Sequence, residues 1–118
     1  MSNQNYKSNL QDRCYRFSLN LIALLDTLPN KRSSWAISDQ LVRSGTSIGA
    51  NLVEATASSS RLEFKKFHEI ALKSANESKY WLMLLNDSQK VDTIDLLREV
   101  TELSNMIASG ILKLKSKL

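Results

Sequence analysis

The sequence predicts an all-α fold, an antiparallel up-down-up-down four-helix bundle formed by one domain, 1–118. The chain is 42% hydrophobic but contains only three glycines and one proline, a composition that favours few, long elements. In four separate segments apolar residues recur every three or four positions, which is the period of a helix. Short polar stretches connect these segments and no strand-like alternation appears, as expected for an antiparallel bundle.

The first two predicted helices span residues 9–28 and 34–57. The apolar stripe of the first helix continues up to Pro29, which cannot extend a helix. It consists of Leu10, Cys14, Phe17, Leu21, Leu24, Leu25 and Leu28. The polar stretch PNKRSS follows, and Ser34 is the expected start signal of the second helix.

The third and fourth helices are predicted at 61–87 and 93–117. Ser60 and Glu63 have the spacing of a capping box, in which each side chain accepts a hydrogen bond from a free backbone N–H group. The polar run NDSQK ends the third helix. Two residues are candidates to cap the fourth helix: Asp92 and Thr93.

Two glycines, Gly45 and Gly49, lie inside the second predicted helix, where each costs about 1 kcal/mol relative to alanine. A missing side chain lets a neighbouring helix approach, and the resulting contacts offset that cost. The helix has two adjacent apolar stripes: Leu41, Gly45, Ile48, Leu52 and Ala55, and Val42, Thr46, Gly49 and Val53. Because a monomeric bundle needs only one stripe, we expect the second to meet another subunit or a large side chain such as Trp81.

A polar row occupies the remaining face of the second predicted helix. It consists of Arg43, Ser47, Asn51 and Glu54. We expect Arg43 to pair with Glu77 of the third helix, and the other members to form hydrogen bonds along and between helices. We interpret these residues as structural rather than as a ligand site.

Sequence features of a catalytic or metal site are missing. His68 is the only histidine, so neither a zinc protease motif nor a di-iron bundle can be assembled. Cys14 lies on an apolar stripe, and a single cysteine excludes an internal disulfide, which favours the cytoplasm. The apolar run WLMLL is too short to span a membrane. We therefore predict no enzymatic activity, no metal, no cofactor and no membrane partner.

The charge pattern suggests a nucleic-acid partner. The net charge is +4, and Lys and Arg side chains bind phosphates by releasing counterions. Candidate binding residues are Lys31, Arg32, Arg61, Lys65 and Lys66, and the final helix ends with Lys113, Lys115 and Lys117. Each group alone is also typical of a solvated helix end.

Two segments carry a resemblance to a known family. QLVRSGTSIGANLVEA at 40–55 and FHEIALKSANESKYWLMLL at 67–85 resemble the bacterial 23S rRNA intervening sequence proteins. The resemblance implies a homopentameric barrel of four-helix bundles. The polar row of the second helix matches the family signature, as do Glu77, Tyr80 and Trp81 of the third. A more distant similarity is to the accessory variability determinant proteins of diversity-generating retroelements, which are basic pentamers that bind nucleic acid.

We therefore expect a non-enzymatic, oligomeric protein whose partner is RNA or DNA, with RNA the first candidate, and which has little sequence specificity because it contacts phosphates. A ring of five copies would repeat a modest basic patch and raise its avidity. The alternative is a structural or protein-interaction scaffold in which the charge serves only solubility.

Overall fold

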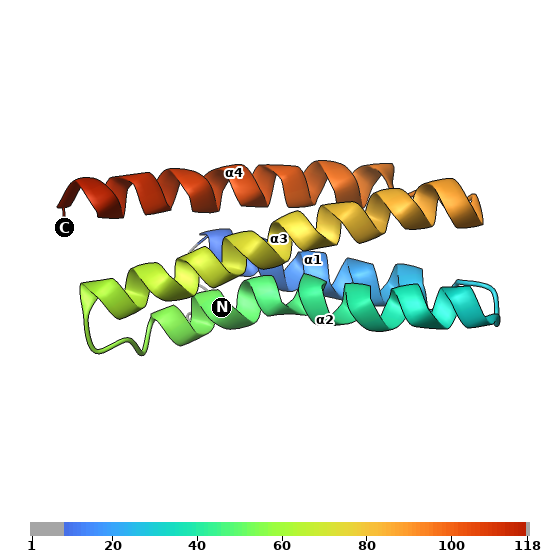
Figure 1. The fold of residues 1–118 in the computed structure, drawn as a ribbon, viewed down its shortest axis with the longest axis horizontal. Helices are drawn as coiled ribbons and strands as arrows, with labels where there is room; N and C mark the ends of the chain where they lie inside the picture. Colours follow the sequence, from blue (N-terminus) through green and yellow to red (C-terminus); the bar gives the residue numbers. More distant parts are fainter. Residues whose placement is uncertain (1–8, 118) are drawn as a thin grey trace.

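The computed structural model describes residues 9–117, with Lys117 described by its backbone alone. Its four helices are α1 (Asn9–Leu25), α2 (Arg32–Ala55), α3 (Arg61–Gln89) and α4 (Ile94–Lys117). Consecutive helices run antiparallel, and α4 also packs against α1, so each helix contacts two neighbours (Figure 1). The bundle measures 47 × 32 × 21 Å. The predicted all-α four-helix fold is confirmed.

The end of α1 lies before the predicted boundary because the last turn tightens. The N–H of Thr27 donates to the carbonyl of Leu24 at 3.0 Å, and that of Leu28 donates to Leu25 at 3.3 Å. These are the i to i−3 bonds of a 3₁₀ turn. Leu28 still packs against the core from this turn.

The predicted role of Ser34 as a start signal is wrong. α2 begins at Arg32, and the N-cap residue Lys31 makes no side-chain capping bond. Ser34 is instead buried inside the helix, where its hydroxyl donates to Oε1 of Gln89 at 3.0 Å. This serine therefore joins the beginning of α2 to the end of α3.

The capping box of α3 is present as predicted. The N–H of Glu63 donates to Oγ of Ser60 at 3.1 Å, while Oε1 of Glu63 accepts from the N–H of Ser59 at 2.9 Å. Of the two candidates for α4, Asp92 accepts from the N–H of Ile94 at 3.0 Å. Thr93 is buried instead, and its hydroxyl donates to the carbonyl of Leu82 on α3 at 3.0 Å.

The core lies between all four helices and is apolar. Its most buried large side chains are Phe17, Leu21, Leu41, Ile48, Leu82, Leu85, Val100, Leu103 and Ile107. Burial of this surface is the main stabilising contribution to the fold.

The two glycines of α2 accommodate α1 of the same chain. A Cβ atom at Gly45 would collide with Cδ2 of Leu21, and one at Gly49 would lie 3.1 Å from Cβ of Cys14. Cys14 of α1 therefore packs against Gly49, so neither Trp81 nor another subunit is needed to explain this glycine, although Gly49 itself stays partly exposed. Trp81 lies partly buried on α3, packed against the core.

Candidate nucleic-acid interface

The predicted basic residues fall at opposite ends of the bundle. Lys31 and Arg32 lie where α2 begins, whereas Arg61, Lys65 and Lys66 lie where α3 begins. Because α2 contains 24 residues, these groups are separated by about 36 Å of helix. The five residues therefore do not form one site.

The antiparallel course of α4 brings further cations to the beginning of α3. α4 ends at the same end of the molecule at which α3 starts, although the two helices diverge there (Figure 1). We call the exposed cations of this region the basic end. They are Arg61, Lys66, Lys113 and Lys115.

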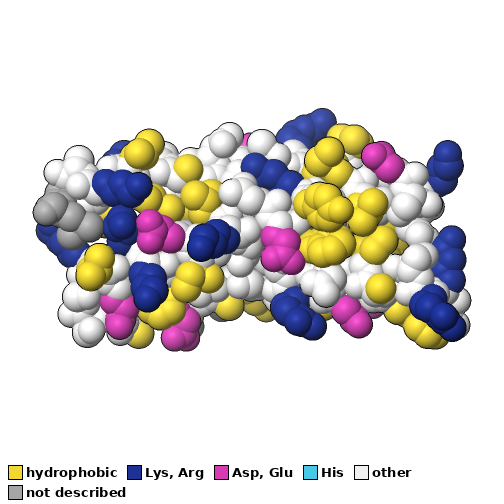
Figure 2. Space-filling view, in the orientation of Figure 1, with side chains coloured by type: hydrophobic (Ala, Val, Ile, Leu, Met, Phe, Trp, Pro, Cys, Tyr) yellow, Lys and Arg dark blue, Asp and Glu magenta, His cyan; other side chains and the backbone are white. Residues whose placement is uncertain are grey.

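Nearby carboxylates leave the basic end largely unneutralised. Glu69 lies 3.4 Å from Nζ of Lys65, and Glu63 is occupied by the cap of α3. The four residues of the basic end form no ion pair with any described residue. Lys and Arg side chains gather at this end of the surface, with a few Asp and Glu among them (Figure 2).

Hydroxyl groups join α2 to α3 along most of their length. Oγ of Ser74 lies 3.0 Å from Oγ of Ser47, and Oγ of Ser78 lies 3.0 Å from Oγ of Ser44. Asn51 extends this line by donating to Oγ of Ser47 at 2.9 Å. Small hydroxyl side chains allow the two helices to approach while satisfying their own hydrogen bonds.

The predicted pair between Arg43 and Glu77 does not form. Glu77 accepts from Nε1 of Trp81 at 2.9 Å instead. Arg43 and Glu54 are exposed, and their side chains form no hydrogen bond or ion pair within the described residues. Both side chains point outward because they lie on the side of α2 farthest from the core. Of the predicted row, only Ser47 and Asn51 form hydrogen bonds.

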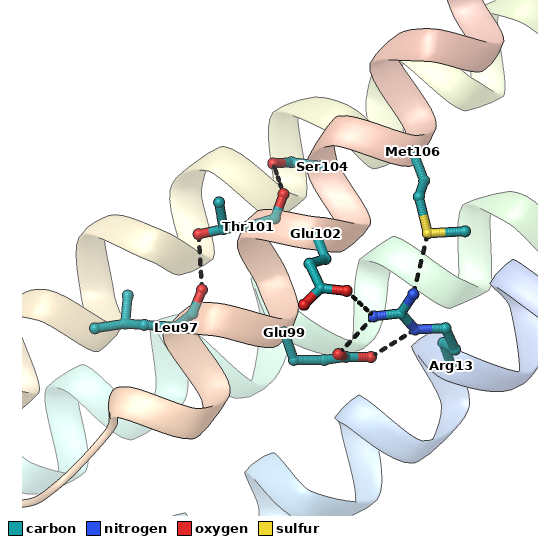
Figure 3. Close-up of polar contacts among 7 residues, drawn as sticks. All are labelled: Arg13, Leu97, Glu99, Thr101, Glu102, Ser104 and Met106. Carbon is teal, nitrogen blue, oxygen red and sulfur yellow. Dashed lines mark hydrogen bonds and ion pairs between the residues drawn. The ribbon is translucent and has the colours of Figure 1, made fainter.

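An ion-pair cluster that the sequence reasoning missed joins α1 to α4 (Figure 3). Arg13 donates to both oxygens of Glu99, at 3.0 and 2.7 Å, and to Glu102 at 2.8 Å. Its remaining nitrogen, Nη1, lies 3.3 Å from the sulfur of Met106. The hydrogen bonds to the two glutamates raise the pKa of Arg13. The three-residue spacing of Glu99 and Glu102 was the only available sequence signal, and it does not identify a partner 86 positions away.

Cys14 and His68 are each held by contacts within the bundle. Cys14 is fully buried, and this burial raises the pKa of its thiol to about 12, so the thiol stays protonated at neutral pH. His68 places Nδ1 2.9 Å from the carbonyl of Phe64. Among the described residues no group of three or more His, Cys, Asp or Glu could hold a metal ion. None of the described helices is long and apolar enough to cross a bilayer.

Two hollows lie in line on the outer face between α1 and α2, and we call them together the α1–α2 groove. The first, of about 340 Å³, is lined by Ile22, Leu25, Asp26, Trp35, Ser38, Asp39 and Val42. The second, of about 300 Å³, is lined by Gln11, Tyr15, Ser18, Thr46, Gly49, Ala50 and Val53. Trp35 is 58% exposed and Val53 55% exposed, whereas Val42, Thr46 and Gly49 are partly buried, so the second apolar stripe of α2 is only partly covered within the chain.

The fold and its surface define a small four-helix bundle with a basic end and an exposed apolar groove. Its family follows from a family model described as 23S rRNA-intervening sequence protein, which matches residues 7–109. The chain belongs to this family, as its helix signatures predicted.

A solved structure supports the same assignment. The chain is similar to a protein of unknown function from the S23 ribosomal protein family of Bacteroides thetaiotaomicron VPI-5482. The two share 35% sequence identity with a TM-score of 0.81, over 86% of this chain and 97% of the other. No curated protein matches the chain.

Proposed function

We propose that this protein is a non-enzymatic, oligomeric nucleic-acid-binding protein that holds RNA by its phosphates through the basic end. The observation that carries this proposal is the set of four exposed cations, Arg61, Lys66, Lys113 and Lys115, without ion-pair partners among the described residues. Cations of this kind bind a phosphate backbone with little regard to sequence. Membership in a family described by rRNA intervening sequences favours RNA over DNA.

Assembly into an oligomer would strengthen RNA binding by the four cations of the basic end. Four cations on one copy give weak binding, but copies joined in a ring present the same cations several times to one RNA. Such multivalency raises avidity by about 10² to 10⁴ without any new contact. The family resemblance leads us to propose a pentamer, and the exposed α1–α2 groove supports association.

The proposal predicts salt-sensitive retention of RNA on a filter. Binding of a labelled single-stranded RNA should weaken at least tenfold between about 50 and 200 mM salt, because each phosphate contact releases counterions. The combined Arg61→Glu and Lys66→Glu variant should lose at least another tenfold. The matched control is Lys31→Glu with Arg32→Glu, the same charge change at the opposite end, which should stay within twofold of the wild type.

Failure of the wild-type protein to retain RNA at about 50 mM salt would contradict the proposal. Equal losses for both double variants would also contradict it, because binding would then follow net charge rather than the basic end.

A scaffold that holds another protein is the second candidate, and exposed aromatic side chains favour it. Trp35 is 58% exposed and Tyr80 60% exposed, and such residues are enriched at protein interfaces. Affinity purification of the tagged chain with and without ribonuclease separates the two candidates. A protein partner that survives digestion supports the scaffold, whereas partners that disappear with the RNA support nucleic-acid binding.

A further inference from the structure

A small hollow lies between α1, α2 and α3, near the end of the bundle where α2 ends and α3 begins (Figure 1). Its volume is about 260 Å³, which is smaller than the clefts that bind drug-sized ligands and suits a single ring system. We call it the Phe64 pocket. It is lined by Leu10, Gln11, Leu52, Thr56, Phe64 and His68.

Phe64 and His68 give the pocket an aromatic wall. Their ring centroids lie 4.5 Å apart and the ring planes are tilted by 41°. Phe64 is partly buried but lies outside the hydrophobic core of the bundle. Its ring is therefore not required to fill the core, and one of its faces can stack on a planar ligand.

The polar groups of the pocket act as acceptors toward a ligand. The hydroxyl of Thr56 donates to the carbonyl of Val53 at 2.7 Å, so its oxygen accepts any further hydrogen bond. Nδ1 of His68 lies 2.9 Å from the carbonyl of Phe64. Because a carbonyl only accepts, Nδ1 carries the proton, and Nε2 of the neutral ring is an acceptor. These two side chains therefore suit a ligand that carries N–H donors.

A cation of the basic end lies next to the pocket. Arg61, Phe64 and His68 are spaced three and four positions apart, so they share one face of α3. Arg61 is exposed one turn before Phe64 and forms no ion pair with any described residue. The neighbouring carboxylate of Glu63 is occupied by the cap of α3. The arrangement places a site for a phosphate beside a site for a flat ring, as both occur in one nucleotide.

We propose that the Phe64 pocket takes one unpaired base of the bound RNA, stacked on Phe64, while Arg61 holds the adjoining phosphate. This inference rests on the proposed function and names the part of the RNA that the protein recognises. A base inside a duplex is paired and stacked, so single-stranded RNA fills the pocket and duplex RNA does not. The two acceptors favour a base with an exocyclic amino group, such as adenine or cytosine, over uracil.

Nuclear magnetic resonance tests the pocket directly, because His68 is the only histidine and its ring resonances report on this place alone. The probes are a short oligoadenylate and a sugar-phosphate strand of the same length without bases. The oligoadenylate should shift the His68 ring resonances through the ring current of the stacked base. It should also bind at least about fivefold more tightly than the strand without bases, because stacking on an aromatic side chain adds that much per base.

A second pair of probes tests the acceptors. Oligocytidylate and oligouridylate differ at the base edge, where cytosine has an amino group and uracil a carbonyl. Oligocytidylate should bind about threefold more tightly, as one additional hydrogen bond allows. Equal binding of the two strands would overturn the assignment of Thr56 and His68 as acceptors for the base.

Phe64→Leu keeps the apolar bulk and removes the ring. The preference for oligoadenylate over the strand without bases should then fall to within about twofold, while binding of the strand without bases stays unchanged. That unchanged binding, together with circular dichroism, checks that the variant is folded. The matched control is Leu62→Ala, a residue 67% exposed on the opposite side of the same turn, which should keep the wild-type preference.

Equal affinity of the wild-type protein for oligoadenylate and for the strand without bases overturns the inference, as does binding that leaves the His68 resonances unmoved. Both results leave the phosphate contacts of the proposed function intact. Failure of both strands to bind overturns the proposed function, and the inference with it.

Discussion

Gly45 shows how one residue sets the distance between two helices. Its lost helix propensity is offset because α1 can place Leu21 and Phe17 against the bare backbone of α2. The sequence could predict that a neighbouring helix packs closely against both glycines, because they lie on the two apolar stripes of α2. It could not identify Cys14 and Leu21 as the neighbours, because the side of α2 on which α1 packs is decided by the whole core.

Gly45→Ala should therefore destabilise the protein by about 1–3 kcal/mol, because the fully buried Leu21 must move within a packed core. Gly110→Ala is the matched control, since it lies inside α4 and a Cβ there would meet nothing within 4 Å. That substitution should stabilise the helix by about 0.5–1 kcal/mol. Urea unfolding of both variants measures the difference, and a Gly45→Ala protein as stable as Gly110→Ala would contradict the packing explanation.

The boundaries of a helix were predictable where the residues that determine them lie close together in the sequence. The start of α3 depends on Ser60 and Glu63, which are three positions apart, so the sequence alone identifies it. The start of α2 was misplaced because Ser34 has its partner, Gln89, 55 positions away. The attachment of α1 to α4 through Arg13 was missed for the same reason, since the sequence alone does not show whether an arginine has an ion-pair partner far along the chain.

The Arg13 cluster should contribute measurable coupling between α1 and α4. A double-mutant cycle with Arg13→Gln and Glu99→Gln should give about 1 kcal/mol at low salt, because the pair is bidentate and partly buried. High salt should reduce that value by screening. The matched control is the cycle of Arg98→Gln with Asp95→Asn, an exposed pair at 3.6 Å whose coupling should be close to zero. Equal coupling free energies in both cycles would show that the Arg13 cluster does not stabilise the contact between α1 and α4.

At the scale of the whole molecule, the surface carries two separate features: a basic end and an apolar groove. The periodicity of α2 predicted an outer apolar stripe, and Trp35, Val42 and Val53 lie exposed or partly exposed along the groove. The basic end was predictable only in part. Lys113 and Lys115 join Arg61 and Lys66 because of the antiparallel course of α4, whereas Lys31 and Arg32 are carried to the opposite end.

Self-association is the claim on which the proposed function depends, because a lone copy leaves the apolar groove exposed to solvent and presents only four cations to RNA. Sedimentation of the purified wild-type chain across a hundredfold dilution into the low micromolar range tests it most directly. The predicted result is one discrete species of five chain masses, as the family resemblance implies, each chain contributing 13.3 kDa. A stable particle of a single chain mass throughout the dilution would contradict it.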